Sequence, residues 1–265
     1  MEKPIIIEFA GVSCCGKSTA FSTIFKQPIP TDVSSAEHVL KTYYVSLTKK
    51  IFFVDITTPA PIYKAIVLTW IHLSNVARYP KFYRLCITAI MQQNQKLKAF
   101  NSFFFKVGKS LLLRKINKGV TLVDEGIIQL LFSLFVQPSA HINKPDHELN
   151  KIMELNKFIE HAPLPDEVIF GPIAPQQQIV DRMINRGHHR VTRGFYTSKD
   201  LTARVNDFTE QSINLQLKIT KQLNGRLIIN TLSDTDQWGK IINRFRDQNG
   251  DIQPNHPTCG ALMYE

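Results

Sequence analysis

The sequence contains few cysteines and no long uncharged hydrophobic run. Its four cysteines are too few for a disulfide scaffold. Cys14 and Cys15 are adjacent, and Cys86 and Cys259 lack the spacing of metal ligands, so we expect a reducing compartment and no zinc site. No uncharged run approaches the roughly 18 residues that a membrane-spanning helix needs, and no apolar signal core follows Met1. These absences predict a cytoplasmic location.

Acidic residues are nearly absent from residues 41–118. This segment has 14 lysines and arginines and a single acid, Asp55, which gives it a charge of +13. The whole chain carries +10, so the other residues together are slightly negative, at −3. A field of one sign favours anionic partners such as phosphates, nucleic acid or a membrane surface. A solvated basic face without a partner is the simpler alternative.

Hydrophobic strands alternate with amphipathic helices in a chain that is 43% hydrophobic and 20% charged, which indicates a globular protein. We expect one domain over residues 1–265, of the α/β class, with a parallel sheet and helices on both faces. The basic region 41–118 is expected to be a large, mostly helical insertion. Expected strands are 4–10, 51–56, 120–123, 167–170 and 227–230. Helical patterns begin near Lys17 and cover 62–78, 82–104, 146–161, 176–186, 200–223 and 236–247, whereas 27–35 is a connection and 249–265 an irregular tail.

A glycine-rich motif follows the first expected strand. Residues 11–18 read Gly-Val-Ser-Cys-Cys-Gly-Lys-Ser, the Walker A pattern of a phosphate-binding loop (P-loop), and a helix is expected directly afterwards. The backbone amides of such a loop and the N-terminus of its helix bind phosphates. Lys17 would reach the β and γ phosphates, and Ser18 would hold Mg²⁺. The expected nucleotide-binding residues are Gly11, Ser13, Cys14, Cys15, Gly16, Lys17, Ser18 and Thr19.

Two carboxylates end the hydrophobic strand 120–123. Asp124 and Glu125 follow this strand directly. In a phosphate-loop protein such a strand lies beside the first one, so we expect Asp124 to serve Mg²⁺. One of the two carboxylates would orient the metal while the other accepts a proton from the attacking group, and either assignment is open at this point. The alternative is a simple helix N-cap.

Four arginines recur every three or four residues after the strand 167–170. They are Arg182, Arg186, Arg190 and Arg193. Gly187 indicates that the helix ends there and that a flap, residues 187–199, begins. Guanidinium groups placed over a phosphoryl group during its transfer stabilise the transition state. The simpler alternative is that these arginines belong to a solvated helix end, where their charge is favourable to the helix dipole.

Together, the loop at 11–18, the strand ending at Asp124-Glu125, the arginine segment and a last strand ending at Asn230 resemble the thymidylate kinase-like group of P-loop kinases. The resemblance spans nearly the whole chain and implies ATP and Mg²⁺ as cofactors. It implies that the segment 187–199 is the lid over ATP and that the region before the acidic strand binds the phosphate acceptor.

The resemblance also implies roles for individual residues near the nucleotide. Arg182 would stack near the base, and Arg186 and Arg190 would touch phosphates. The adenine pocket would be lined by Asn230, Thr231 and Leu232. True thymidylate kinases have Asp-Arg where this chain has Asp124-Glu125. Because a carboxylate cannot hold a monophosphate as an arginine does, this departure argues against thymidylate as the acceptor.

The leading hypothesis is an ATP- and Mg²⁺-dependent kinase that phosphorylates a hydroxyl of an anionic acceptor. That acceptor would be a nucleotide, a nucleic-acid end, or a phosphorylated sugar or glycolipid. The alternative is a P-loop ATPase, GTPase or nucleotide switch whose region 41–118 docks on nucleic acid or a membrane; a non-catalytic binding module ranks third. A second copy of the chain, forming a homodimer, is a further candidate partner. The stretch 103–115 mixes aromatic and cationic residues, and we expect a core helix rather than a membrane contact there.

Overall fold

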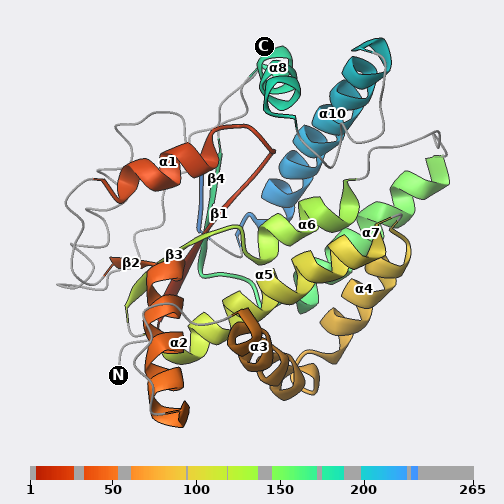
Figure 1. Ribbon diagram of the computed structural model, residues 1–265. Helices are drawn as coiled ribbons and strands as arrows, with labels where there is room; N and C mark the ends of the chain where they lie inside the picture. The colour runs from red at the N-terminus through yellow and green to blue at the C-terminus, as the bar shows by residue number, and fades with distance from the viewer. Residues whose placement is uncertain are drawn as a thin grey trace.

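Five parallel strands form a single sheet in the order β2-β3-β1-β4-β5 (Figure 1). The computed structural model describes residues 4–26, 33–52, 61–93, 95–117, 119–136, 145–171, 175–187, 198–225 and 228–231. The strands are β1 (Ile5–Ala10), β2 (Val33–Ser35), β3 (Val120–Asp124), β4 (Glu167–Phe170) and β5 (Ile228–Thr231). The predicted α/β class with a parallel sheet is confirmed.

Helices connect the strands, as parallel pairing requires. The helices are α1 (Lys17–Ile24), α2 (Ala36–Phe52), α3 (Pro61–Val76), α4 (Pro80–Met91), α5 (Lys96–Ile116), α6 (Ile127–Phe135), α7 (Pro145–His161), α8 (Gln176–Arg186) and α10 (Ser198–Leu223). Four of them, α2 to α5, lie between β2 and β3. The described part of the basic region 41–118 therefore consists of helices and the turns between them.

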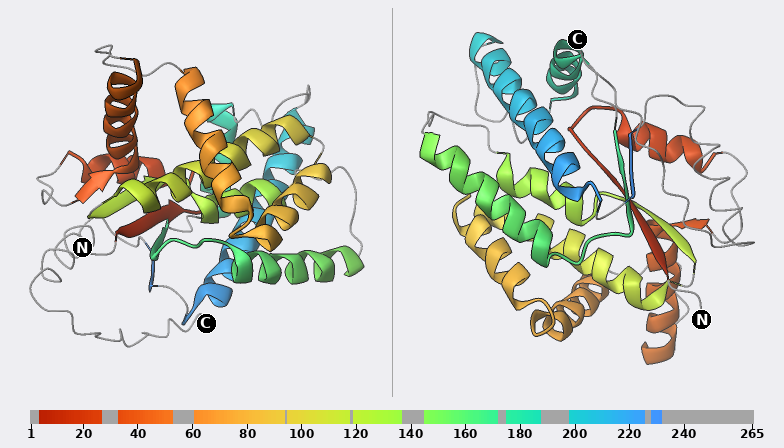
Figure 2. Two further views of the ribbon diagram at one scale, coloured as in Figure 1. Left: turned by 90° about the horizontal axis from the view of Figure 1, so that it is seen from below. Right: turned by 180° about the vertical axis from the view of Figure 1, so that it is seen from behind.

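Side chains of β1 alternate between two hydrophobic layers. Ile7 and Phe9 pack with Phe21 and Ile24 of α1 on one face of the sheet. The neighbouring residue Ala10 belongs to the larger core on the opposite face, which α5, α6 and α10 help to build. Figures 1 and 2 show α1 on one side of the sheet and these three helices on the other. The expectation of helices on both faces is met.

One predicted strand was placed wrongly. Ile51 and Phe52 are the last residues of α2, and the remainder of 51–56 lies outside the described residues. The second strand of the chain is instead β2, in the segment that we expected to be a connection. With only three residues, β2 offers almost no period-two pattern.

The helical spacing over 82–104 belongs to two helices. Helix α4 ends at Met91 and α5 begins at Lys96, with a polar run between them. The expected core helix at 103–115 is confirmed, because Phe103, Val107 and Leu111 are buried within α5. The expected helix 236–247 and the tail 249–265 lie outside the described residues.

A buried carboxylate of β1 caps helix α6. Glu8 is 1% exposed and accepts three backbone hydrogen bonds, from the amides of Gly126 (2.9 Å), Ile128 (3.0 Å) and Gln129 (2.8 Å). Gly126, at the N-cap position, has no side chain to do this, and a Cβ there would lie 2.6 Å from Glu8 Oε2. The carboxylate therefore binds the positive end of α6 from a neighbouring strand, and it fixes the helix that follows the acidic pair.

We predict that Glu8→Ala destabilises the protein by about 3 kcal/mol or more, because three buried amides lose their acceptor. Glu8→Gln keeps one acceptor oxygen and should fall between Glu8→Ala and the wild type. Urea unfolding measures both variants. A loss within about 1 kcal/mol for Glu8→Ala would show that the amides find other partners.

Candidate functional site

The glycine-rich segment forms the turn between β1 and α1, as predicted. Strand β1 ends at Ala10, and α1 begins at Lys17. Gly11 has a φ of +137°, and a Cβ at this position would lie 3.0 Å from Gln216 Oε1 and 3.2 Å from the amide nitrogen of Gly171. Only glycine combines this backbone conformation with such close neighbours. The loop thus crosses tightly over the carboxyl end of the sheet.

Two buried glutamines hold the start of the loop. Gln129 Oε1 of α6 accepts a hydrogen bond from the Gly11 amide at 2.9 Å. Gln216 Oε1 of α10 accepts one from the Val12 amide at 3.2 Å. Gln216 Nε2 also donates to the Gly171 carbonyl at the end of β4, at 3.2 Å. Sequence reasoning missed both residues. A signal existed for Gln129, which is an isolated amide in the apolar run Ile-Ile-Gln-Leu-Leu.

Asp124 lies beside the loop and has an unpartnered buried oxygen. Strands β1 and β3 pair in parallel with Phe9 opposite Asp124, so both strands end at the same edge. Among the described residues, Oδ1 of Asp124 has no hydrogen-bond partner although it is buried. Ser18 is in the first turn of α1, and its side chain is exposed. These two residues fit a magnesium ion, which proteins commonly hold with one or two carboxylates together with substrate phosphates.

A magnesium ion at this position would need the phosphates of a substrate as further ligands. The described residues contain no cluster of three or more His, Cys, Asp or Glu side chains that would hold a metal ion alone. A shared site between Asp124, Ser18 and a triphosphate requires no such cluster.

Glu125 is held between two lysines. Its Oε1 lies 3.2 Å from Lys17 Nζ, and its Oε2 lies 3.3 Å from Lys106 Nζ of α5. Burial raises the pKa of the Glu125 carboxyl, but the ammonium groups of Lys106 and Lys17 outweigh burial and hold the pKa at about 2. The ion pairs join the loop, the end of β3 and α5 in one charged cluster.

Helix α5 supplies a second, partly buried cation. Lys109 Nζ donates to the backbone carbonyl of Asp124 at 2.8 Å. Burial lowers the pKa of Lys106 and of Lys109, while nearby carboxylates, Glu125 for Lys106 and Glu8 for Lys109, oppose that shift. Sequence analysis counted both lysines only as part of a basic region. Their spacing of three residues places both lysines on one face of α5, but it does not indicate what that face contacts.

Backbone strain is concentrated at this site. Within the described ranges, the non-glycine residues with positive φ are Cys14 (63°) and Glu125 (62°). Such conformations cost free energy and persist where the surroundings impose them, often at functional sites. Cys15 is buried, and burial raises the pKa of its thiol, so Cys15 stays a neutral packing group rather than a reactive thiolate.

The structure brings one of the predicted arginines to the loop. Arg182 Nη1 of α8 donates to the Cys14 carbonyl at 3.4 Å. Arg186 is exposed as the last residue of α8, and Gly187 ends the helix in the left-handed conformation, as predicted. Arg190 and most of the lid, residues 188–197, lie outside the described residues, and residues 198 and 199 already belong to α10.

The predicted adenine-side residues are placed only by their backbone. Asn230 and Thr231 pair with Ile169 and Phe170 of β4, so they end an adjacent strand at the same edge of the sheet. Their side chains lie outside the described part of the chain.

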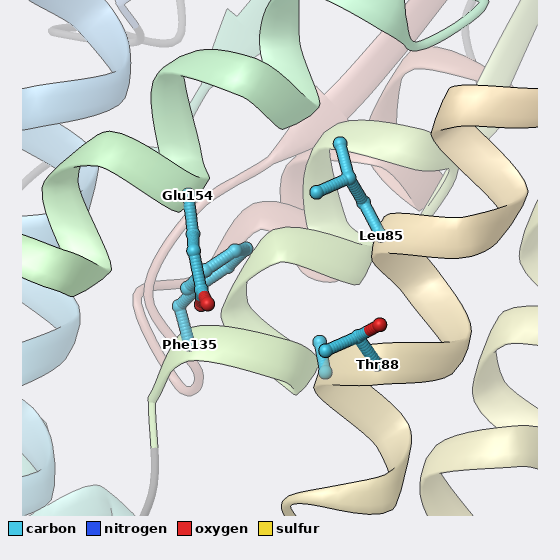
Figure 3. A pocket seen from close by; sticks show the side chains of 5 residues that line it. Leu85, Thr88, Phe135 and Glu154 are labelled. Carbon is cyan, nitrogen blue, oxygen red and sulfur yellow. The ribbon is translucent and has the colours of Figure 1, made fainter.

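A small pocket elsewhere has no part in this site. It lies between α4, α6 and α7 and is lined by Leu85, Thr88, Ala89, Phe135 and Glu154 (Figure 3). It has room for about one water molecule and mostly apolar walls. Its lining residues come from these three helices and include neither a loop residue nor a member of the acidic pair, so we assign it no function.

The low pKa of Glu125 predicts how stability depends on pH. Its folded-state value of about 2 lies below the ordinary 4.5, so the ion pairs favour folding above pH 4.5 and this contribution is lost as the pH falls through about 2. The free energy of unfolding should therefore differ most between wild type and Glu125→Gln above pH 4.5, and the difference should shrink in acid. Urea unfolding at a series of pH values tests this. Glu160→Gln, on the exposed side of α7, is the matched control; a pH-independent gap for Glu125→Gln would contradict the assignment.

Comparison with known proteins does not assign the chain to a family. No protein-family model and no curated protein matches the chain. Any functional conclusion therefore depends on the site itself.

Proposed function

We propose that the chain is a P-loop phosphotransferase of the thymidylate kinase-like type, which uses ATP and Mg²⁺ to phosphorylate a hydroxyl of an anionic acceptor. One observation carries the proposal: the buried, unpartnered Asp124 Oδ1 lies one strand away from the Walker A loop and its Lys17. A glycine-rich turn alone could be a simple connection. A turn, a lysine and an unpartnered carboxylate oxygen at one sheet edge support phosphate and metal binding together.

The loop would bind the triphosphate through its backbone. The amides of residues 13–18 and the N-terminus of α1 favour negative charge. Lys17 is paired with Glu125 in the structure, so a triphosphate must compete with this carboxylate for the lysine. Phosphate oxygens offer Lys17 the same kind of partner, and the exchange conserves one charge-assisted hydrogen bond.

This exchange also assigns the two carboxylates. Glu125 with a pKa of about 2 is a poor base while both lysines neutralise it. When Lys17 turns to the phosphates, Glu125 loses one of two cations and its basicity rises. We therefore assign Glu125 to accept the proton of the acceptor hydroxyl. Asp124 and Ser18 would hold Mg²⁺, which would neutralise charge on the β and γ phosphates.

The lysines of α5 support an anionic acceptor. Thymidylate kinases, which the sequence resembles, place an arginine where Glu125 stands. Here Glu125 instead forms an ion pair with Lys106, whose side chain is only 15% exposed. Lys106 of α5 therefore supplies a cation next to the position at which those kinases have an arginine. Buried ammonium groups are costly without an anionic partner. A phosphate or carboxylate on the acceptor would share Lys106 with Glu125.

We expect labelled γ-phosphate to move from ATP to an acceptor in a screen of nucleosides, nucleotides, nucleic-acid ends and sugar phosphates. Lys17→Ala and Asp124→Asn should each lower the transfer rate by about 100-fold or more, because transition-state charge loses its partners. Asp124→Asn should in addition raise the Mg²⁺ concentration needed for half-maximal rate. Lys221→Ala, an exposed lysine of α10, serves as the control.

Two results would overturn the proposal. Transfer that persists in Lys17→Ala would show that the loop does not bind the triphosphate. Hydrolysis of ATP without transfer to any acceptor would favour the nucleotide hydrolase instead.

Lys106→Met should affect the acceptor more than ATP. We expect the KM for the acceptor to rise by about 10-fold or more, because one desolvated cation is lost. The KM for ATP should change less. Steady-state kinetics with each substrate varied in turn measures both values, and an equal rise in the two would contradict acceptor binding by Lys106.

A further inference from the structure

Helix α3 is apolar on both of its sides. Its inner side contacts α5, where His72 Nε2 hydrogen-bonds to the Phe104 carbonyl at 2.8 Å and the two rings stack. Its outer side carries an exposed stripe, the α3 face, at a spacing of three or four residues. This face consists of Ile62, Ile66, Trp70, Leu73 and Val76.

The α3 face is exposed to an unusual degree. Trp70 alone is 72% exposed, and Ile62, Ile66 and Leu73 are each about 60% exposed. The helix lies on the outer side of α5, away from the sheet (Figures 1 and 2). A helix that is apolar all round is normally covered on both sides, and contiguous exposed apolar side chains mark interaction surfaces.

Exposed hydrophobic side chains are concentrated in this part of the molecule. Of the twelve large ones in the described residues, ten lie on α3, α4 and α5. Met153 and Leu217 are the other two. Five of these ten side chains belong to the α3 face, so the stripe is not scattered surface exposure.

The same region is basic and lacks acids. Residues 61–117 contain ten lysines and arginines and no aspartate or glutamate. Lys106 and Lys109 face the site, but Arg78 and Lys81 are exposed just beyond the end of α3. Lys115 also borders this helix, with Nζ 3.5 Å from Ser74 Oγ. An apolar stripe whose charged neighbours along 61–117 are all cations suits a partner that offers both hydrocarbon and negative charge.

We infer that the α3 face docks the protein on an anionic phospholipid bilayer. The helix would lie in the interface with its stripe among the acyl chains and the bordering cations near the headgroups. No helix among the described residues combines the length and apolar character needed to cross a bilayer, so α3 lies on the surface. This docking is independent of the proposed phosphoryl transfer.

Other occupants fit these observations less well. A two-fold dimer through α3 would place the same acid-free surface of each copy against the other, so cations would face cations. Nucleic acid would satisfy the cations through its phosphates, but the aliphatic side chains of the stripe would stay in water. Of these three occupants, the bilayer alone provides for both features.

Fluorescence of Trp70 tests the inference directly. The chain has two tryptophans, Trp70 and Trp238, so the variant Trp238→Phe reports on the α3 face alone. We expect its emission to shift to shorter wavelength and to be protected from acrylamide with vesicles containing about one quarter phosphatidylglycerol, but not with pure phosphatidylcholine. Raising the salt to about 0.5 M should weaken binding, because it screens the headgroup charge.

Variants separate the stripe from the rest of the surface. In co-sedimentation with the same anionic vesicles, Trp70→Ser/Leu73→Ser should bind about 10-fold more weakly or worse. Leu217→Ser removes a leucine from α10 that is also more than half exposed and should bind as wild type. Circular dichroism checks that each variant is folded.

Several outcomes would overturn the inference. One is the absence of any spectral shift with anionic vesicles. A second is equal vesicle binding by the double variant and wild type. A third is a Trp70 emission that is already blue-shifted and protected from acrylamide without lipid, which would mean that protein covers the α3 face. Sedimentation velocity would then show whether a second copy or another segment of the same chain covers it. Salt-sensitive RNA binding that the double variant retains, without vesicle binding, would assign the cations to nucleic acid.

Discussion

The ion pairs of Glu125 with Lys17 and Lys106 hold the candidate site together. They connect the loop after β1, the end of β3 and the middle of α5, segments far apart in the sequence. Parallel pairing of β1 with β3 brings the first two of these segments together, because both strands end at the same edge. Once Glu125 is fixed in its left-handed conformation, its carboxylate turns toward the lysines and Asp124 is left at the strand end. The positions of the loop, of Asp124 and of Lys106 therefore depend on one small charged cluster.

The charges around this cluster alternate in sign, which is what makes their burial tolerable. Glu8 binds the N-terminus of α6, Lys109 binds the Asp124 carbonyl, and Glu125 binds two further lysines. Each of these groups thus has a hydrogen-bonded partner, and removing one would leave another unpaired. Oδ1 of Asp124 is the exception among them, since it has no partner in the described part of the chain. Such an arrangement is weak evidence for stability by itself, because desolvation offsets much of the attraction. Its position at the sheet edge beside a Walker A loop favours a role in binding and chemistry.

The sequence predicted the parts of the site that depend on local pattern. The loop, the strand that carries Asp124, the end of α8 at Gly187 and the parallel sheet all follow from motifs or periodicities within a few residues. Glu8, Gln129, Gln216 and the two lysines of α5 act across distances of many residues, and their spacing gives no direct sign of a partner. In the sequence, Glu8 is simply one polar residue inside a hydrophobic strand. Only the packing of α6 against β1 reveals that it caps a helix. The strand β2 was missed for another reason, since three residues are too few to show a pattern.

The basic region 41–118 contains two groups of cations with different surroundings. Lys106 and Lys109 point inward from α5, are desolvated, and are matched by carboxylates of the site. Arg78, Lys81 and Lys115 lie outward near α3, where the segment 61–117 offers no acid to balance them. The net charge of +13 for residues 41–118 does not distinguish these two groups. Because α5 carries inward lysines and supports α3 on its other side, it separates a candidate catalytic surface from a candidate membrane surface. The two can be altered independently, since a substitution on the exposed stripe of α3 leaves the buried lysines and their carboxylates in place.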